Sequence, residues 1–157
     1  YVGDAATCQG LGQMLARIGI HAAVETAPAS IYFSRLRTPD NQLPLFLLGV
    51  GNDTGDAIGT LVGVIHRYDR ERRMGSVNRS GFADAEVDGL IQQSMVELDM
   101  ARRSALMEQA MRLATERYAV IPLYQPMVIF ASRAGLNYLP NRDEQTLAMR
   151  ALPAGGR

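Results

Sequence analysis

The chain has 157 residues, of which 47% are hydrophobic and 20% are charged, a composition that suits one globular domain with a hydrophobic core. Sixteen basic residues balance sixteen acidic ones, so the net charge gives no attraction to nucleic acid or to an anionic membrane. The longest apolar runs, such as residues 43–50, are far shorter than a membrane-spanning helix. The single cysteine, Cys8, excludes an internal disulfide and a metal cluster built from several cysteines.

The first residues, Tyr1-Val2-Gly3-Asp4, contain neither an initiator methionine nor the basic and apolar regions of a secretion signal. We therefore expect a fragment or a processed product, and the missing signal is no argument for the cytoplasm. The cysteine count is equally silent on the compartment, because many periplasmic proteins lack disulfides.

The first half of the sequence predicts two helices and two strands. Asp4 is a suitable N-cap for a helix over residues 4–18, and Gly19 ends this helix in a conformation with positive φ. Residues 21–26 alternate weakly and predict a strand, after which a short helix runs over residues 28–35. Residues 43–50 are apolar on both sides, as in a strand buried inside a sheet. The first helix carries an apolar stripe formed by Leu11, Met14, Leu15 and Ile18.

The second half predicts a helical hairpin followed by strands. A glycine-rich loop is expected to run into a helix near Asp56, and residues 66–81 predict a solvated loop. Asp84 and Asp99 are expected N-caps of two consecutive helices. Strands are predicted at 120–124, 127–132 and 147–152, with a turn at 140–144. The residues expected to face inward from the hairpin are Val87, Leu90, Ile91, Met95, Leu98, Leu106, Met107, Ala110, Met111 and Leu113.

Four segments in chain order carry a resemblance. Residues 15–20 read as a helix end, a glycine and the start of a strand, and residues 47–56 as an apolar strand that ends in a glycine- and aspartate-containing loop. Residues 78–91 combine an asparagine, a glycine–aromatic pair and a Glu-Val-Asp run, and Asp99 and Arg103 follow. The last segment runs from Val120-Ile121-Pro122 to the Pro-Asn-Arg-Asp-Glu turn. Together they resemble the peptide/nickel-binding family (oligopeptide- and dipeptide-binding type) of bacterial extracellular solute-binding proteins of ABC importers, over nearly the whole chain.

The resemblance implies a clamshell of two α/β lobes that close over a ligand. The alternation of helices and strands independently predicts an α/β fold. The resemblance refines this to a periplasmic-binding-protein-like lobe, a mixed sheet flanked by helices, truncated at its N-terminus. Residues 1–126 are expected to form most of the second lobe, and residues 127–157 the return to a first lobe that is missing from this sequence. The exposed edges of a truncated sheet would favour self-association.

The resemblance assigns to Asp53 the carboxylate that holds the α-ammonium group of a peptide. In a closed cleft such a charge-assisted hydrogen bond contributes about 1.5–3 kcal/mol. Asp53 follows a predicted buried strand, and α/β sheets bind ligands at the carboxyl ends of their strands. Val50, Gly51 and Asn52 would line the same wall, although Val50 stands where the family often has tryptophan. The alternative is that Asp53 and Asp56 only organise a turn and cap the next helix.

Three further residues are candidates for ligand contact. Arg79 and Phe82 precede the helical hairpin, and Tyr124 lies near the expected crossover between the lobes. Each has a structural alternative: a solvated loop for Arg79, a core anchor for Phe82 and a half-buried strand position for Tyr124. The family's partner for a ligand carboxylate has no counterpart in this sequence, so no residue is assigned to it.

The sequence favours a binding protein over an enzyme. His21 and His66 have no second histidine or cysteine at metal-ligand spacing, so no metal site is expected. No Gly-x-Ser-x-Gly motif presents a nucleophilic serine. Gly49 and Gly51 lack the third glycine of a dinucleotide fingerprint, and no cofactor is expected.

The expected function is capture of a peptide-like solute in the periplasm, or on the outer face of the membrane, and its delivery to an ABC permease. One alternative is a ligand-sensing or regulatory domain of the same fold, which a signal peptide or lipobox encoded upstream would argue against. The other is a small hydrolase, whose activity would depend on a single serine.

Overall fold

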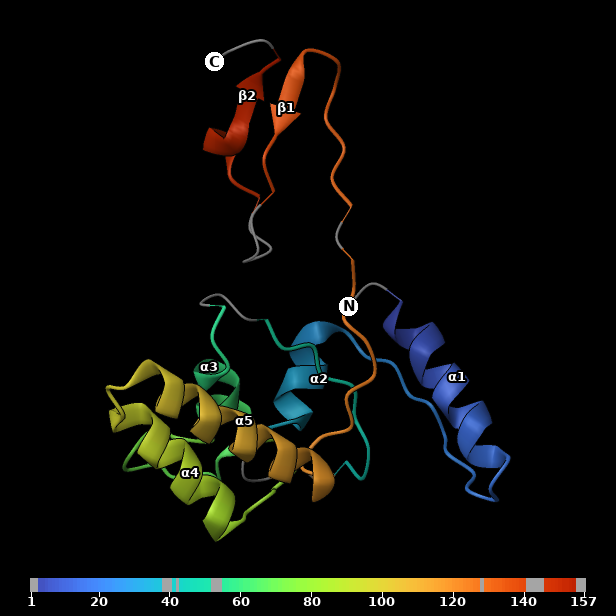
Figure 1. Cartoon of the computed structure of the whole chain (residues 1–157). Helices are drawn as coiled ribbons and strands as arrows, with labels where there is room; N and C mark the ends of the chain where they lie inside the picture. The colour runs from blue at the N-terminus through green and yellow to red at the C-terminus, as the bar shows by residue number, and fades with distance from the viewer. Residues whose placement is uncertain are drawn as a thin grey trace.

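The computed structural model describes residues 3–37, 41, 43–51, 55–127, 129–140 and 146–154. Figure 1 shows a helical body and, apart from it, a small hairpin near the C-terminus. The elements are α1 (Asp4–Ala16), α2 (Ala29–Arg35), α3 (Ile58–Thr60), the π-helical turn η1 (Leu61–Ile65), α4 (Ala85–Val96), α5 (Met100–Glu116), β1 (Leu136–Tyr138), the 3-10 turn η2 (Ala148–Arg150) and β2 (Ala151–Pro153).

The core of the body lies between the α4–α5 hairpin and the continuous helical segment α3–η1. Aliphatic side chains from all three helical segments fill it, and Ala119 closes one end. The apolar spacing of α4 and α5 predicts this packing, and most of the expected inward residues are buried or half-buried. Met95 and Leu98 are exceptions, because they lie at the tip of the hairpin and are 47% and 92% exposed. The buried apolar residues of this core are Leu61, Val64, Ile65, Val87, Ile91, Met107, Ala110, Leu113, Ala114 and Ala119.

Both predicted N-caps of the hairpin are confirmed. The Asp84 carboxylate accepts the N–H groups of Glu86 at 3.0 Å and of Val87 at 3.1 Å. The Asp99 carboxylate accepts the N–H of Arg102 at 2.9 Å. These bonds satisfy backbone donors that have no partner inside the helix, so each aspartate fixes where its helix begins.

α1 forms where the sequence predicts it, but without a buried face. Its N-cap is Gly3, and Asp4, the expected cap, is instead the first helical residue. Gly19 ends the helix as predicted: its φ is +84°, and the N–H of Ile20 reaches back to the carbonyl of Leu15 at 3.0 Å. No residue of α1 is buried, and Met14 is 63% exposed, so its apolar stripe has no covering element among the described residues.

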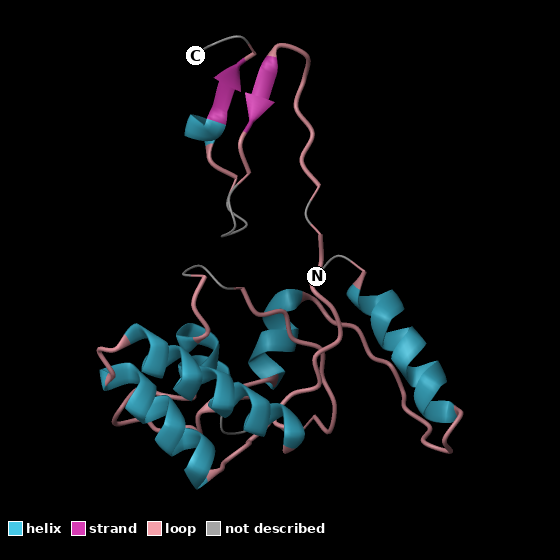
Figure 2. Cartoon of the chain, in the orientation of Figure 1, coloured by secondary structure: helices cyan, strands magenta, loops and turns pink. Residues whose placement is uncertain are grey.

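The expected mixed sheet is not formed by the described residues. Their only sheet is the antiparallel pair β1–β2, with Leu136 opposite Pro153 (Figure 2). No backbone–backbone hydrogen bond joins residues 21–27, 43–48 or 120–127 to any other described residue. Propensity favours an extended backbone, but a strand also needs a neighbour to pair with. The chain therefore has mixed helix and strand content, in which helices dominate.

The strand predictions near the C-terminus are only partly correct. Residues 129–132 are extended without pairing, and the segment predicted as a strand at 147–152 contains η2 before β2 begins. The hairpin is held by its own contacts, including the rings of Phe130 and Tyr138, whose centroids lie 5.1 Å apart. Most of the turn expected at 140–144 lies outside the described residues. The assignment of residues 127–157 to another lobe stays a prediction.

The segment 66–81 forms a loop whose charged side chains are mostly exposed, as predicted, and its own contacts fix its shape. Asp69 and Met74 exchange backbone hydrogen bonds of 2.9 and 3.0 Å, and the side chains of His66 and Asn78 are buried. Most of the charged side chains of this segment are exposed, while the N–H groups of Gly75 and Val77 donate to the carbonyls of Val62 and Gly63, so the backbone is held to η1.

Candidate functional site

Only two of the four residues predicted to form the ligand-binding wall lie among the described residues. Val50 is 47% exposed and Gly51 is also exposed, at the end of the extended segment 43–51. Asn52 and Asp53 lie outside the described residues. The strand expected before them is not paired or buried as predicted: Leu45 is 62% exposed, and the segment is held by the Tyr32 hydroxyl, which donates to the carbonyl of Leu47 at 2.6 Å.

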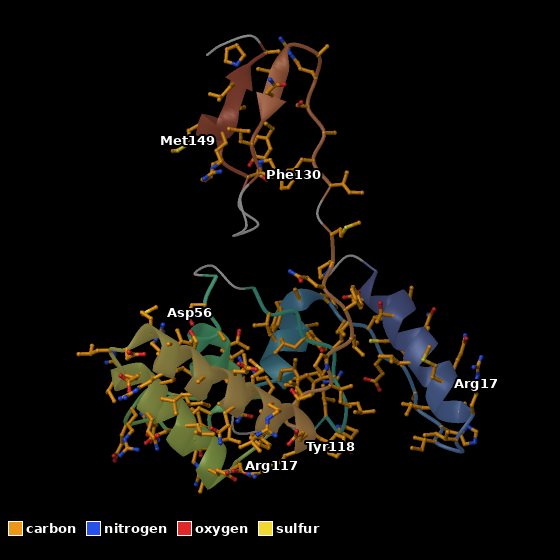
Figure 3. All side chains as sticks on the ribbon, viewed as in Figure 1. Arg17, Asp56, Arg117, Tyr118, Phe130 and Met149 are labelled. Atoms are coloured by element: carbon orange, nitrogen blue, oxygen red, sulfur yellow. The ribbon has the colours of Figure 1, made fainter. Side chains whose placement is uncertain are left out.

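Asp56 organises the start of α3 and joins it to α5. One carboxylate oxygen of Asp56, which is labelled in Figure 3, accepts the N–H of Ile58 at 2.9 Å, and the other lies 2.7 Å from the guanidinium of Arg103. The bond from Ile58 and, next to it, the bond from Arg103 hold the pKa of Asp56 below its ordinary value of 3.8. The formal N-cap position of α3 is Ala57, yet the Asp56 carboxylate satisfies a backbone donor there, in line with its expected capping role.

Asn78 is the organising residue of the loop before α4. Its side chain is 2% exposed, and its amide nitrogen donates to the carbonyls of His66 at 3.0 Å and Phe82 at 2.8 Å. Its amide oxygen accepts from the N–H of Gly81 at 3.0 Å and from the hydroxyl of Ser80 at 3.2 Å. Every hydrogen-bonding group of this amide is thus used inside the protein, so the glycosylation sequon at this position has no accessible acceptor.

Arg79 and Phe82, two predicted contact residues, flank this loop. Phe82 packs against the hydrophobic core, which agrees with its alternative role as a core anchor. Arg79 is half-buried and not in a solvated loop, and its carbonyl accepts the side-chain amide of Asn41 at 2.6 Å. The loop therefore connects η1, α4 and the chain before residue 43.

Tyr124 lies in the extended segment 120–127 and is 59% exposed. Its hydroxyl is 3.3 Å from the hydroxyl of Thr7, which links this segment to α1. The strand tyrosine expected here is therefore not observed, because the segment has no strand neighbour. The structure does not gather Tyr124, Arg79 and Val50 around one cavity.

A buried polar cluster around His66 has no signal in the sequence. The ring is 1% exposed; Nδ1 donates to the carbonyl of Arg67 at 2.7 Å, and Nε2 accepts from the side-chain nitrogen of Gln92 at 3.0 Å, a tautomer assigned from these partners. Asp88, 4% exposed, accepts the backbone N–H of Arg67 at 3.0 Å and pairs with its guanidinium. Because the His66 ring and the Asp88 carboxylate both form their hydrogen bonds with protein groups, the cluster holds the loop to α4.

Two hollows among the described residues are not lined by Val50, Gly51 or Tyr124 of the predicted wall. One, of about 240 Å³, lies over the His66 cluster beside Arg72 and Asp69. The other is an open, mainly apolar hollow along α5, lined by Ala57, Met107, Met111 and Thr115 among others.

Within the described part of the chain, no group of three or more His, Cys, Asp or Glu side chains is arranged to hold a metal ion. None of the helices described there combines the length and the apolar character needed to cross a bilayer.

Comparisons of the chain with protein-family models, with curated proteins and with solved structures give no match. The resemblance to solute-binding proteins therefore rests on the four sequence segments alone.

Proposed function

We propose that this chain is part of a solute-binding protein of an ABC importer, from the lobe that carries one wall of the binding cleft. It captures a peptide-like solute between two lobes, and ligand contacts made by both lobes favour the closed form that a membrane permease recognises. The chain is a binding component and not an enzyme, and it works in the periplasm or on the outer face of the membrane.

The observation that carries the proposal is the ion pair between Asp56 and Arg103. These residues belong to two different segments of the resemblance, 47–56 and 78–103, and their side chains are 28% and 19% exposed. The pair holds the end of the glycine-rich loop against α5. A loop that presents Asp53 to a ligand needs such an anchor on a rigid helix, because a ligand contact depends on fixed geometry.

Other residues of the resemblance also join elements of the fold. Asn78 fixes the loop before α4, Asp84 and Asp99 begin the two helices, and Asp88 binds Arg67. These polar side chains form bonds that connect segments of the fold, as expected of residues in a structural motif. This supports the resemblance without naming the solute.

The extended segments support the proposal in a second way. Residues 20–26, 43–50 and 120–127 carry several large apolar and aromatic side chains that are exposed: Ile20 50%, Leu45 62%, Val50 47%, Ile121 68% and Tyr124 59%. Exposed apolar side chains on extended segments of this kind are costly for an isolated domain. In the proposed lobe they are strands of a mixed sheet, paired with strands that lie outside the described residues.

The proposal is tested by identifying what the protein carries. The protein is produced from its complete gene, and small molecules that co-purify with it are identified by mass spectrometry. A peptide-like solute is expected, and Asp53→Asn should weaken its binding by about 10- to 100-fold, because a charge-assisted hydrogen bond of about 1.5–3 kcal/mol is lost.

Glu108→Gln is the matched control, because it removes the same charge from an exposed position on α5. Its ligand content should equal that of the unchanged protein. The residues 1–157 alone offer one wall of the cleft, so isothermal titration should show only feeble binding of dipeptides. Tight binding by this chain alone, or an Asp53→Asn protein that retains its ligand fully, would contradict the proposal.

A further inference from the structure

The chain contains sixteen basic residues, and all of them are arginine. Four of the sixteen, Arg67, Arg70, Arg72 and Arg73, lie within seven residues, between η1 and α4. Since the chain as a whole carries no net charge, this concentration makes one local basic surface on an otherwise balanced protein. We call residues 67–74 the arginine turn; it is the green segment that precedes α4 in Figure 1.

The arginine turn has a fixed shape. Asp69 and Met74 close it with two backbone hydrogen bonds, and the Asp69 carboxylate accepts the N–H of Arg72 at 3.0 Å inside it. Gly75 docks its base on η1 by donating to the carbonyl of Val62 at 2.8 Å. A Cβ at Gly75, whose φ is +65°, would lie 2.4 Å from the carbonyl oxygen of Arg67, so only glycine fits there.

Arg73 adopts a conformation that is unfavourable for a residue with a side chain. Its φ is +58°, in the left-handed region, where a non-glycine residue costs about 1–2 kcal/mol. Glycine or asparagine would occupy this position with less strain. An arginine held there by a rigid turn indicates that its side chain has a use outside the turn's own stability.

Two of the four guanidinium groups of the arginine turn, those of Arg70 and Arg73, are not engaged by other described residues. Arg67 is paired with Asp88, and Arg72 lies 3.9 Å from Asp69. Arg70 and Arg73 are exposed and make no ion pair or hydrogen bond with any described residue. Two guanidinium groups without a protein partner among the described residues are thus presented three positions apart on one preorganised turn.

We propose that the arginine turn is a docking surface for an acidic segment of a protein partner. The planar guanidinium binds a carboxylate through two parallel hydrogen bonds, a geometry that lysine lacks, and a rigid turn loses little entropy when such pairs form. This inference rests on the turn alone and holds whether or not the chain binds a solute.

An anionic membrane is a poorer fit for this surface. Polybasic membrane sites use a dense cluster of positive charges, whereas Asp69 and Glu71 alternate with the arginines here and repel a diffuse negative surface. The hollow beside the turn is also lined by Asp69 and Asp88, which disfavours a free phosphate ion inside it. Discrete carboxylates can contact Arg70 and Arg73 while avoiding these acidic groups.

The test uses fluorescence anisotropy with a labelled hexaglutamate peptide, and a hexaglutamine peptide of the same length as the neutral probe. The chain should bind hexaglutamate, more weakly as salt is raised, and should not bind hexaglutamine. The double variant Arg70→Ala with Arg73→Ala should lose about 10-fold or more in affinity. Alanine at position 73 has the same Cβ as arginine, so the backbone strain of the turn is unchanged, and circular dichroism verifies the fold.

The matched control is Arg17→Ala with Arg133→Ala, which removes the same charge from two exposed positions outside the turn. Its affinity for hexaglutamate should stay within about 2-fold of the unchanged chain. Equal losses in the two double variants, or no binding of hexaglutamate at all, would overturn the proposal. Binding to phosphatidylglycerol vesicles that depends on Arg70 and Arg73, without peptide binding, would replace it with a membrane surface.

Discussion

At the scale of single residues, Asn78 has the largest structural role of any polar side chain in the described part of the chain. It is 2% exposed and contacts His66, Ser80, Gly81 and Phe82 through both ends of its amide. Asn78→Ala would leave two buried carbonyls and one N–H without partners. The free energy of unfolding should fall by about 2–4 kcal/mol, measured by urea denaturation.

The exposed Asn137 on β1 provides the control for this prediction. Asn137→Ala should change the free energy of unfolding by less than about 0.5 kcal/mol. Asn78→Asp distinguishes the contributions of the two ends of the amide to stability. Aspartate keeps the oxygen that accepts from Gly81 but loses the N–H groups that donate to His66 and Phe82. If Asn78→Ala proved as mild as Asn137→Ala, the loop would not depend on this amide.

At the scale of elements, the ends of the α4–α5 hairpin are joined by Arg117. Its guanidinium, just after α5, pairs with the carboxylates of Asp84 and Glu86 at the start of α4. Arg117 and then the N–H of Val87 hold the pKa of Asp84 below its ordinary value of 3.8. A carboxylate whose pKa is lowered by folding adds stability above its unfolded pKa and loses that contribution as pH falls through the folded value.

The ion pair therefore has a measurable pH dependence. Arg117→Gln should lower Tm by about 1–3 °C at neutral pH, a small effect because the pair is exposed to solvent. The difference between the variant and the unchanged chain should shrink as pH is lowered below 3.8, because Asp84 then becomes protonated in both. Arg112→Gln, which breaks an exposed pair with Glu116 inside α5, should change Tm by less than about 1 °C. A difference in Tm that persists unchanged at pH 2 would show that Arg117 acts through packing.

The sequence predicts some elements better than others. The reason is how far apart along the sequence the residues lie whose bonds form each element. The helix caps Asp84 and Asp99 and the helix-ending Gly19 are recognised from neighbouring residues, and all three are confirmed. The strands needed partners far away in sequence, and residues 21–26, 43–48 and 120–124 of the predicted strands have no backbone partner among the described residues. In the candidate site, the Asp56–Arg103 pair joins residues 47 positions apart, and the His66 cluster joins residues 21–26 positions apart, which no local pattern reveals.

At the scale of the whole molecule, the described residues divide into a packed helical body and long extended segments without backbone partners. Amide hydrogens exchange with solvent at rates set by the opening of their hydrogen bonds. In the chain of residues 1–157, amides of α4 and α5 that face the core should be protected about 10³-fold or more, because their exchange requires unfolding of the body. Amides of residues 21–27 and 120–127 should show almost no protection, since they donate to no described backbone group.

The same measurement on the protein from the complete gene separates two accounts of these segments. If they are strands of a lobe, as proposed, their amides should become protected by about 10²-fold or more once their neighbours in the sheet are present, while those of α4 and α5 change little. If they are ordinary surface connections, they should exchange equally fast in both proteins. Protection of residues 120–127 in the short chain would contradict the extended, unpaired backbone itself. The outcome thus decides whether the exposed side chains of Ile121 and Tyr124 belong to an open surface or to the interior of a sheet.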